Sequence, residues 1–158
     1  MGVKVDMDIR EIRDYLQREA EKNIHRVIAM LHFVGLEVVN QIRNSQISNW
    51  NDRTGNLRSS IGYIITLDGE PIEMSDFPKV DGWKRQTTDP DGSAIGRTYA
   101  RSLTSLYPHG IALIVVAGME YAAYVEKMEN KTVLAQGELV ARQLLSQLLQ
   151  KYNIAKGQ

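Results

Sequence analysis

Histidine, a common side chain in proton transfer and zinc binding, occurs three times in the chain. His25 and His32 lie seven residues apart in a segment with helical periodicity, so they point the same way, two turns apart. Zinc-binding histidines on one helix are four residues apart, whereas a spacing of seven separates the rings by about 10 Å. His109 lies in a Pro-His-Gly turn. We expect three ordinary histidines and no metal site.

Other catalytic patterns are also missing from the sequence. It has no Gly-x-Ser-x-Gly elbow, phosphate-binding loop or dinucleotide fingerprint, and the serine of residues 92–96, Gly-Ser-Ala-Ile-Gly, comes one position too early for an elbow. Glu120, Glu126 and Glu129 are candidate paired carboxylates, which we expect to face solvent. Without cysteine, thiol catalysis and thiolate metal sites are excluded. The sequence therefore predicts no enzyme and no cofactor, and a small hydrolase is the least favoured hypothesis.

A nucleic-acid site would rest on the basic and aromatic side chains of residues 83–101, namely Trp83, Lys84, Arg85, Arg97, Tyr99 and Arg101. Aspartates in the same region cancel that charge: Asp76, Asp81, Asp89 and Asp91. The whole chain is also balanced, with 19 Lys and Arg against 19 Asp and Glu. Because binding to phosphates requires uncompensated cations, a nucleic-acid-binding accessory protein of a mobile element is only the second hypothesis.

The size and composition of the chain are typical of one globular domain. It has 158 residues, of which 43% are hydrophobic and none is cysteine. This length supports a single domain over residues 1–158 with its own core. The first thirteen residues alternate charged and apolar side chains, unlike a signal peptide, and the longest nearly apolar run, Ile111 to Met119, is about half of a membrane span. We expect a soluble protein of a reducing, intracellular compartment.

A long amphipathic helix is predicted to begin after Asp8. Apolar residues recur at steps of three and four, which places them on one helical face: Ile9, Ile12, Leu16, Ala20, Ile24, Val27, Ile28, Leu31, Val34, Val38 and Ile42. Asp8 can cap the N-terminus, with Glu11 three residues on, as in a capping box. Such a helix would be about 54 Å long, more than a domain of this size is wide. We expect it to bend, to break near Asn23 or to project from the body.

A β-hairpin is predicted after a polar turn in which Thr54 is the expected cap of one short helical turn. Residues 61–67 alternate between two faces, as a strand does, and residues 70–74 return as an edge strand. Between them, Asp68-Gly69 favours the left-handed dihedral angles of a two-residue hairpin turn. Pro71 lies in the returning strand and is tolerated at a sheet edge.

A long irregular insert is predicted at about 75–107, because prolines, glycines and aspartates interrupt any periodicity in residues 75–93. Within the insert, Ser93 is the expected cap of a short helix. The apolar, β-branched run from Gly110 to Gly118 then predicts a central strand that is buried on both faces.

Two helices are predicted to follow this strand. The spacing of Tyr121, Tyr124, Val125 and Met128 predicts a two-turn helix, and a C-terminal helix begins near Thr132. The leucine-rich surface of the last helix is wider than one contact requires, so either the first helix or another subunit covers the excess. The expected fold class is α+β, with an antiparallel sheet flanked by the long N-terminal helix, the short helix and the C-terminal helix.

Two segments resemble one known protein family. Residues 53–61, Arg-Thr-Gly-Asn-Leu-Arg-Ser-Ser-Ile, resemble the TG-x-L-x-x-S-I turn of tail-completion, or head–tail connector (neck), proteins of tailed bacteriophages. Residues 116–126 resemble the strand-then-helix YA-x-Y-V-E signature of the same family, and the order of the predicted elements also agrees. The positions that carry the resemblance are Thr54, Gly55, Leu57, Ser60, Tyr121, Ala122, Tyr124, Val125 and Glu126.

The resemblance implies a structural virion protein of a phage or prophage that completes the tail or joins the head to the tail, working as a ring. Its implied partners are other phage neck and tail proteins and further copies of itself, with no membrane and no specific nucleic acid. The implied location is the host bacterial cytoplasm during assembly and then the virion neck or tail. The motif residues either pack the fold or contact neighbours, with Glu126 expected to face outward. A ring of this kind needs two complementary patches, for which the first helix, the 75–107 insert and the last helix are candidates.

Overall fold

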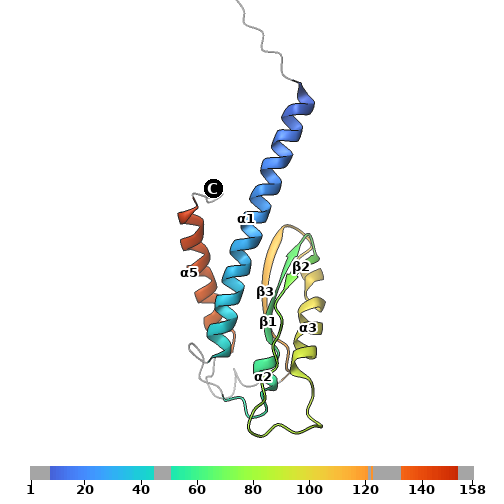
Figure 1. The fold of residues 1–158 in the computed structure, drawn as a ribbon, viewed down its shortest axis with the longest axis vertical. Coiled ribbons are helices and arrows are strands. Elements are labelled where there is room, and N and C mark those ends of the chain that lie inside the picture. The colour runs from blue at the N-terminus through green and yellow to red at the C-terminus, as the bar shows by residue number, and fades with distance from the viewer. Residues whose placement is uncertain (1–7, 45–50, 121, 123–132, 153–158) are drawn as a thin grey trace, which may run out of the picture.

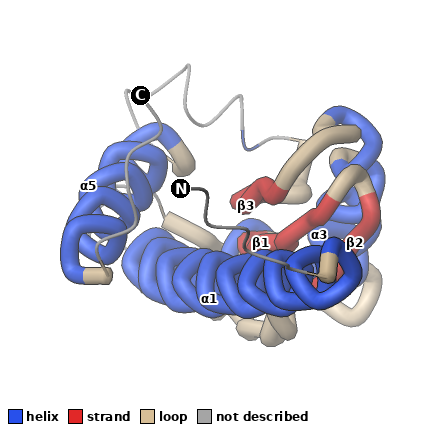
Figure 2. Tube along the Cα trace, turned by 90° about the horizontal axis from the view of Figure 1, so that it is seen from above, coloured by secondary structure: helices blue, strands red, loops and turns tan. Residues whose placement is uncertain are grey.

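The computed structural model describes residues 8–44, 51–120, 122 and 133–152. In that part of the chain the fold is α+β, as the sequence predicts, with layers in the order α5, α1, sheet and α3 (Figures 1 and 2). The elements, in chain order, are α1 (Ile9–Arg43), α2 (Asn56–Ser59), β1 (Ile61–Leu67), β2 (Glu70–Met74), α3 (Gly92–Ser102), the 3-10 turn η1 (Thr104–Leu106), β3 (Ile111–Ala117) and α5 (Ala135–Lys151).

Helix α1 is unbroken and projects from the body, which decides among the three predicted possibilities (Figure 1). Asp8 caps it as predicted, because its Oδ1 accepts a hydrogen bond from the N–H of Arg10 at 2.9 Å. The C-terminal half supplies core residues, including Val34, Val38 and Ile42, which are at most 1% exposed. The apolar side chains at the start of the helix remain exposed, as the projection requires.

The sheet is antiparallel throughout, in the order β2-β1-β3. The hairpin prediction is confirmed, since Asp68 and Gly69 have φ values of 52° and 84° and join β1 to β2. Pro71 lies in the edge strand β2, paired with Thr66, next to a register shift between Ile65 and Thr66.

The prediction of a central strand between Gly110 and Gly118 is wrong in one respect. Among the described residues, β3 pairs with β1 alone and therefore lies at an edge, whereas β1 is central. Helices cover both faces of β3, with Ile114 and Val116 on the α3 side and Leu113 and Val115 on the α1 side. An apolar run indicates that both faces of a strand are buried, but it does not indicate how many strands pair with that strand.

The predicted insert at 75–107 is irregular only in part. Residues 76–91 contain no helix or strand, but α3 and η1 follow, and α3 covers the second face of the sheet. The cap of α3 is Asp91 rather than Ser93, because Asp91 Oδ1 accepts from the N–H groups of Ser93 and Ala94. The Lys79 ammonium, and then the Ala94 N–H, lower the pKa of the Asp91 carboxyl.

Ser93 lies inside α3 and does not cap this helix as predicted. Its hydroxyl donates a hydrogen bond to the main-chain carbonyl of Phe77. Phe77 has a φ of 48° and is fully buried with Ile64, Ala100 and Val116. The segment predicted as an excursion therefore supplies the largest side chain of the second core cluster.

Helix α5 packs against the buried half of α1, so the first helix covers part of its leucine-rich surface, one of the two predicted possibilities. Leu139 and Tyr152 stay 60% and 57% exposed on the remaining surface. Helix α5 begins at Ala135, close to the predicted start near Thr132. The predicted two-turn helix from Tyr121 to Met128 falls outside the described residues, except for Ala122.

The burial of Phe77 yields a first prediction. Replacing it by Ala is expected to lower the free energy of unfolding by about 3–5 kcal/mol, because a fully buried aromatic ring leaves a cavity. Trp83, in the same segment but 77% exposed, is the matched control, and its replacement by Ala should cost about 0.5 kcal/mol or less. Urea denaturation measures both variants. Equal small losses would show that the segment is dispensable to the core.

Candidate functional site

The turn that resembles the phage motif begins with a glycine that no other residue can replace without strain. Gly55 has a φ of 82°, in the left-handed region. A Cβ added there would lie 1.9 Å from the carbonyl oxygen of Val80. The main chain of residues 80–84 packs directly on the turn, since the Gly82 N–H donates to the Thr54 carbonyl at 3.0 Å. Gly55 is thus required both by its backbone angle and by this close approach.

The short helix after Gly55 is capped chiefly by Asp52 rather than by the predicted Thr54. Asp52 Oδ1 accepts from the N–H of Gly55 at 3.0 Å, and Oδ2 accepts from the N–H of Arg58 at 2.6 Å. Thr54 Oγ1 accepts from the N–H of Asn56 at 3.3 Å, a longer contact. A carboxylate has two oxygens and spans both amides, which one hydroxyl does not.

The remaining residues of this motif act inside the fold. Leu57 is 2% exposed and Ser60 is fully buried, with its hydroxyl donating to the Leu57 carbonyl at 2.8 Å. The hydroxyl of Ser59 donates to the Gly55 carbonyl at 2.7 Å and accepts from the Val80 N–H at 2.8 Å. These side chains hold the turn against residues 80–84 and the sheet. Of the two roles predicted for the motif residues, packing the fold or contacting neighbours, this is packing.

The structure brings the two motif segments together at one end of the sheet. The Gly118 N–H donates to the Ser60 carbonyl at 3.1 Å, and Ile61 pairs with Ala117. Ala122 is 8% exposed in the main core cluster, and its N–H donates to the Met119 carbonyl at 2.9 Å. The other predicted positions of this motif lie outside the described residues: Tyr121, Tyr124, Val125 and Glu126.

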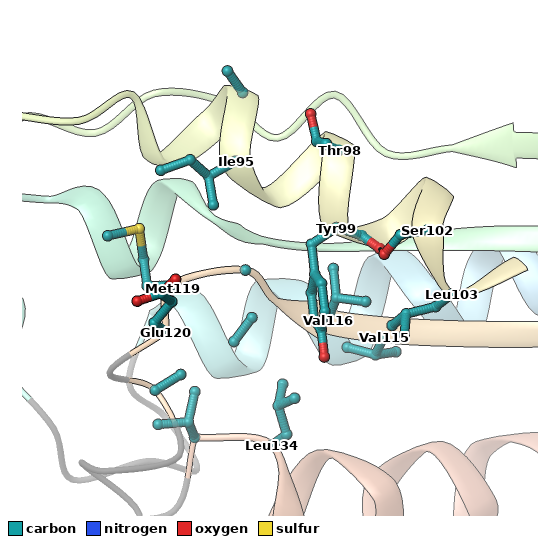
Figure 3. Close-up of a pocket in the computed structure, with 15 residues that line it drawn as sticks. Ile95, Thr98, Tyr99, Ser102, Leu103, Val115, Val116, Met119, Glu120 and Leu134 are labelled. Carbon is teal, nitrogen blue, oxygen red and sulfur yellow. Dashed lines mark hydrogen bonds between the residues drawn. The ribbon is translucent and has the colours of Figure 1, made fainter.

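A largely apolar groove of about 900 Å³ lies beside the two motifs, between α3, the end of β3 and the start of α5 (Figure 3). Ile95, Tyr99 and Leu103 line it from α3, and Val115 lines it from β3. Tyr99 reaches from α3 toward β3 and is 45% exposed. Glu120, one of the candidate carboxylates, is exposed at the same groove, whereas Glu126 and Glu129 are not described.

A polar cluster that sequence reasoning missed joins α1 to both strands of the hairpin. His32 Nδ1 lies 2.7 Å from the Tyr63 hydroxyl and 3.0 Å from Glu73 Oε2. Because a carboxylate only accepts, this geometry favours a proton on Nδ1. Burial, and then the charges of Glu73 and Asp76, raise the pKa of Tyr63 to about 12. His25 is exposed on the projecting part of α1, and His109 is exposed in its turn.

The residues of the nucleic-acid hypothesis do not form one cationic surface. Arg85 Nε contacts Asp81 Oδ1 at 3.2 Å, and Arg85 also donates to Asn56 Oδ1 at 3.1 Å. Arg97 donates to the Asp76 carbonyl. These two cations therefore hold the 75–91 segment in place.

Trp83, the stacking candidate, is exposed, and the Lys84 ammonium lies 4.7 Å from the centre of its ring. Arg101 is exposed on α3, while Tyr99 lines the groove.

A buried arginine is a second feature that the sequence did not reveal. Arg43 is 7% exposed, and its guanidinium donates to the carbonyls of Pro78, at 2.8 Å, and Ile61. Burial, and then the charge of Arg58, lower the pKa of Arg43. It ties the end of α1 to the start of β1 and to the 75–91 segment. Its position after a helical apolar stripe carried no signal of this role.

Comparisons of the chain with protein-family models, with curated protein sequences and with solved structures found no match. The family resemblance rests on the two motifs and on the order of the elements. Within the described residues, no three His, Asp or Glu side chains gather closely enough to hold a metal ion. None of the helices described combines the length and the apolar character needed to cross a membrane.

The double cap at Asp52 yields a second prediction. Replacing Asp52 by Ala removes two hydrogen-bond acceptors and should lower the free energy of unfolding by about 1–2 kcal/mol, as measured by urea denaturation. Asp52→Asn keeps one acceptor and should lose less. Thr54→Ala is the comparison variant and should cost about 0.5 kcal/mol or less, because its contact is long. A larger loss for Thr54→Ala than for Asp52→Ala would restore Thr54 as the principal cap.

The raised pKa of Tyr63 yields a third prediction, measured by absorbance titration of the seven tyrosines. Tyr63 should ionise at about pH 12. Its folded pKa exceeds the ordinary value of 10.0, so the unfolded chain releases this proton first. The stabilisation is therefore complete below pH 10 and is lost as the pH rises toward 12.

The control for this titration is Tyr15→Phe, since Tyr15 is 57% exposed. Tyr63→Phe should remove the step at about pH 12 and make the alkaline loss of stability less steep. A titration curve that Tyr63→Phe leaves unchanged would contradict the assignment.

Proposed function

We propose that the chain is a structural virion protein of a tailed phage or prophage, which completes the tail or joins the head to the tail as part of a ring. Its partners are further copies of itself and other neck and tail proteins. It works in the host bacterial cytoplasm during assembly and then in the neck or tail of the virion. The observation that carries this proposal is the exposed apolar face of the projecting half of α1.

The exposed apolar face of α1 has the features of a protein–protein interface. Ile9 and Leu16 are 71% and 60% exposed, and they belong to the same stripe whose later residues are buried in the core. Clustered exposed apolar side chains of this kind mark sites of protein contact. Charged neighbours flank the stripe in compensated pairs, such as Lys22 with Glu19 at 2.8 Å, so the contact is apolar rather than electrostatic.

The family motifs support the proposal in a second way. The Thr54–Ser60 turn and the Val116–Ala122 segment, the two segments that resemble the phage family, meet at Ser60 and Gly118. A fixed glycine turn next to a sheet end positions the helices on either side of the sheet. The motifs thus build a rigid frame for contacts made elsewhere, as expected of a small ring subunit.

The fourth prediction tests this function in the parent element. Deleting the gene and inducing the phage should give filled heads and separate tails that do not join, seen by electron microscopy. A plasmid copy should restore infectious particles. Leu16→Glu should fail to restore them while keeping the circular dichroism and the unfolding midpoint of the native chain, because this side chain is exposed.

The matched control is Gln17→Glu, which adds the same charge one residue away from the stripe and should restore infectivity. Normal virions after deletion would refute the proposal. Tight binding of the purified chain to DNA, falling steeply with salt, would instead favour the nucleic-acid-binding accessory protein.

A further inference from the structure

The outer edge of β3 offers a row of backbone groups for another strand. The Gly118 N–H donates to Ser60, which fixes the alternation of the β1–β3 ladder. Residues 112, 114 and 116 therefore direct their N–H and C=O groups toward β1, whereas Ile111, Leu113, Val115 and Ala117 direct theirs outward. In the part of the chain that the structure describes, no strand pairs with this outer side.

Within β3 itself, the sequence lacks the features that usually block strand addition. Its sequence, Ile-Ala-Leu-Ile-Val-Val-Ala, contains no Pro and no charged residue, and its register with β1 is regular over all seven pairs. The groove of about 900 Å³ runs beside the end of this edge, lined mainly by apolar side chains of α3, β3 and residues 133–134. A strand added at this edge would lie along the existing groove, as in β-strand addition.

A segment with the matching pattern precedes α1. Residues 3–7, Val-Lys-Val-Asp-Met, alternate apolar and polar side chains with the period of a β-strand. On one side of the sheet, the added strand would face the main core cluster and Leu134, which suits Val3, Val5 and Met7. On the other side, α3 contributes the hydroxyls of Thr98 and Ser102 beside the apolar Ile95 and Leu103, and the two hydroxyls are the groups that suit Lys4 and Asp6.

The arm formed by residues 3–7 cannot reach the β3 edge of its own chain. Val27 is the first residue of α1 that packs against the main core cluster. Asp8 lies 19 residues before it on a continuous helix, or about 28 Å farther out at 1.5 Å per residue. The five residues of the arm span at most about 18 Å when fully extended. The projecting helix therefore places Asp8, the residue after the arm, too far from its own β3 edge for the arm to span the distance.

We propose that residues 3–7 of one copy add as a fourth strand to the β3 edge of a second copy. The inference rests on the ring assembly proposed above and names the contact that builds it. Because the arm and the edge are different surfaces, the contact is heterologous, and its repetition closes a ring or extends a filament. The exposed stripe of α1, from Ile9 to Leu16, follows the arm onto the neighbouring copy.

The fifth prediction uses the absence of cysteine, which allows disulfides to be placed one pair at a time. One preparation carries Ile114→Cys, and a second carries Lys4→Cys or Asp6→Cys. The proposal places the polar arm residues on the α3 side of the sheet, which Ile114 also faces. In every register, parallel or antiparallel, in which all five arm residues pair with β3, Lys4 or Asp6 then lies opposite Ile114. Mixing and mild oxidation should therefore give a covalent dimer with at least one of the two arm variants.

Val5→Cys is the matched control, since its side chain would lie on the other face of the sheet and should not react with Cys at position 114. The covalent dimer is scored on a denaturing gel. No dimer with either polar position, or equal dimer with all three positions, would overturn the inference.

Proline at position 5 gives a second measurement that does not alter the core. Val5→Pro removes a backbone donor from the arm and should weaken self-association about tenfold in sedimentation, whereas Val5→Thr should not. Unchanged association of Val5→Pro would count against strand addition. If the chain forms rings but neither arm variant gives the disulfide, this contact is refuted and the proposed function stands. If the disulfide forms but deletion of the gene leaves head–tail joining intact, the contact stands and the proposed function is refuted.

Discussion

Close packing around the central strand β1 is the constraint on which the rest of the structure depends. A helix lies against each face of this strand, and each approaches through a glycine. A Cβ at Gly35 of α1 would lie 2.8 Å from the Tyr63 ring, and a Cβ at Gly96 of α3 would lie 2.6 Å from the Ser60 carbonyl. Both helices are thereby fixed close to the sheet, and every candidate site takes its geometry from this arrangement.

Patterns that depend on local geometry predicted the corresponding elements well. The helical stripe and the Asp8 cap located α1, and Asp68-Gly69 located the hairpin, because caps and turns are determined by residues close in sequence. Features that depend on distant partners were missed or misplaced. The edge position of β3 depends on what lies beside it in space, and the burial of Phe77 depends on α3, which the sequence places far along the chain.

The candidate site divides in the same way. The Thr54–Ser60 turn was singled out by its resemblance to a family motif, and in the structure this turn packs against residues 80–84. The sequence did not identify Asp52, whose acceptor role is common to many exposed aspartates, nor the contact of His32 with Tyr63 and Glu73, which joins three elements. The hydrophobic periodicity of a sequence does not show which side chains contact one another across a sheet.

The cooperativity of helix formation explains how the uncovered first half of α1 stays ordered. Helix formation is costly to nucleate but favourable to extend, and the buried half of α1 provides the nucleus. The Asp8 cap and the Lys22–Glu19 pair stabilise the extension locally. A helix that is already ordered loses little conformational entropy when a neighbour covers it, so even a modest apolar stripe can contribute net affinity. With a formal net charge of zero, the proposed assembly would gain no long-range attraction from net charge, and a preformed helix with an open strand edge would offer contacts that do not require one.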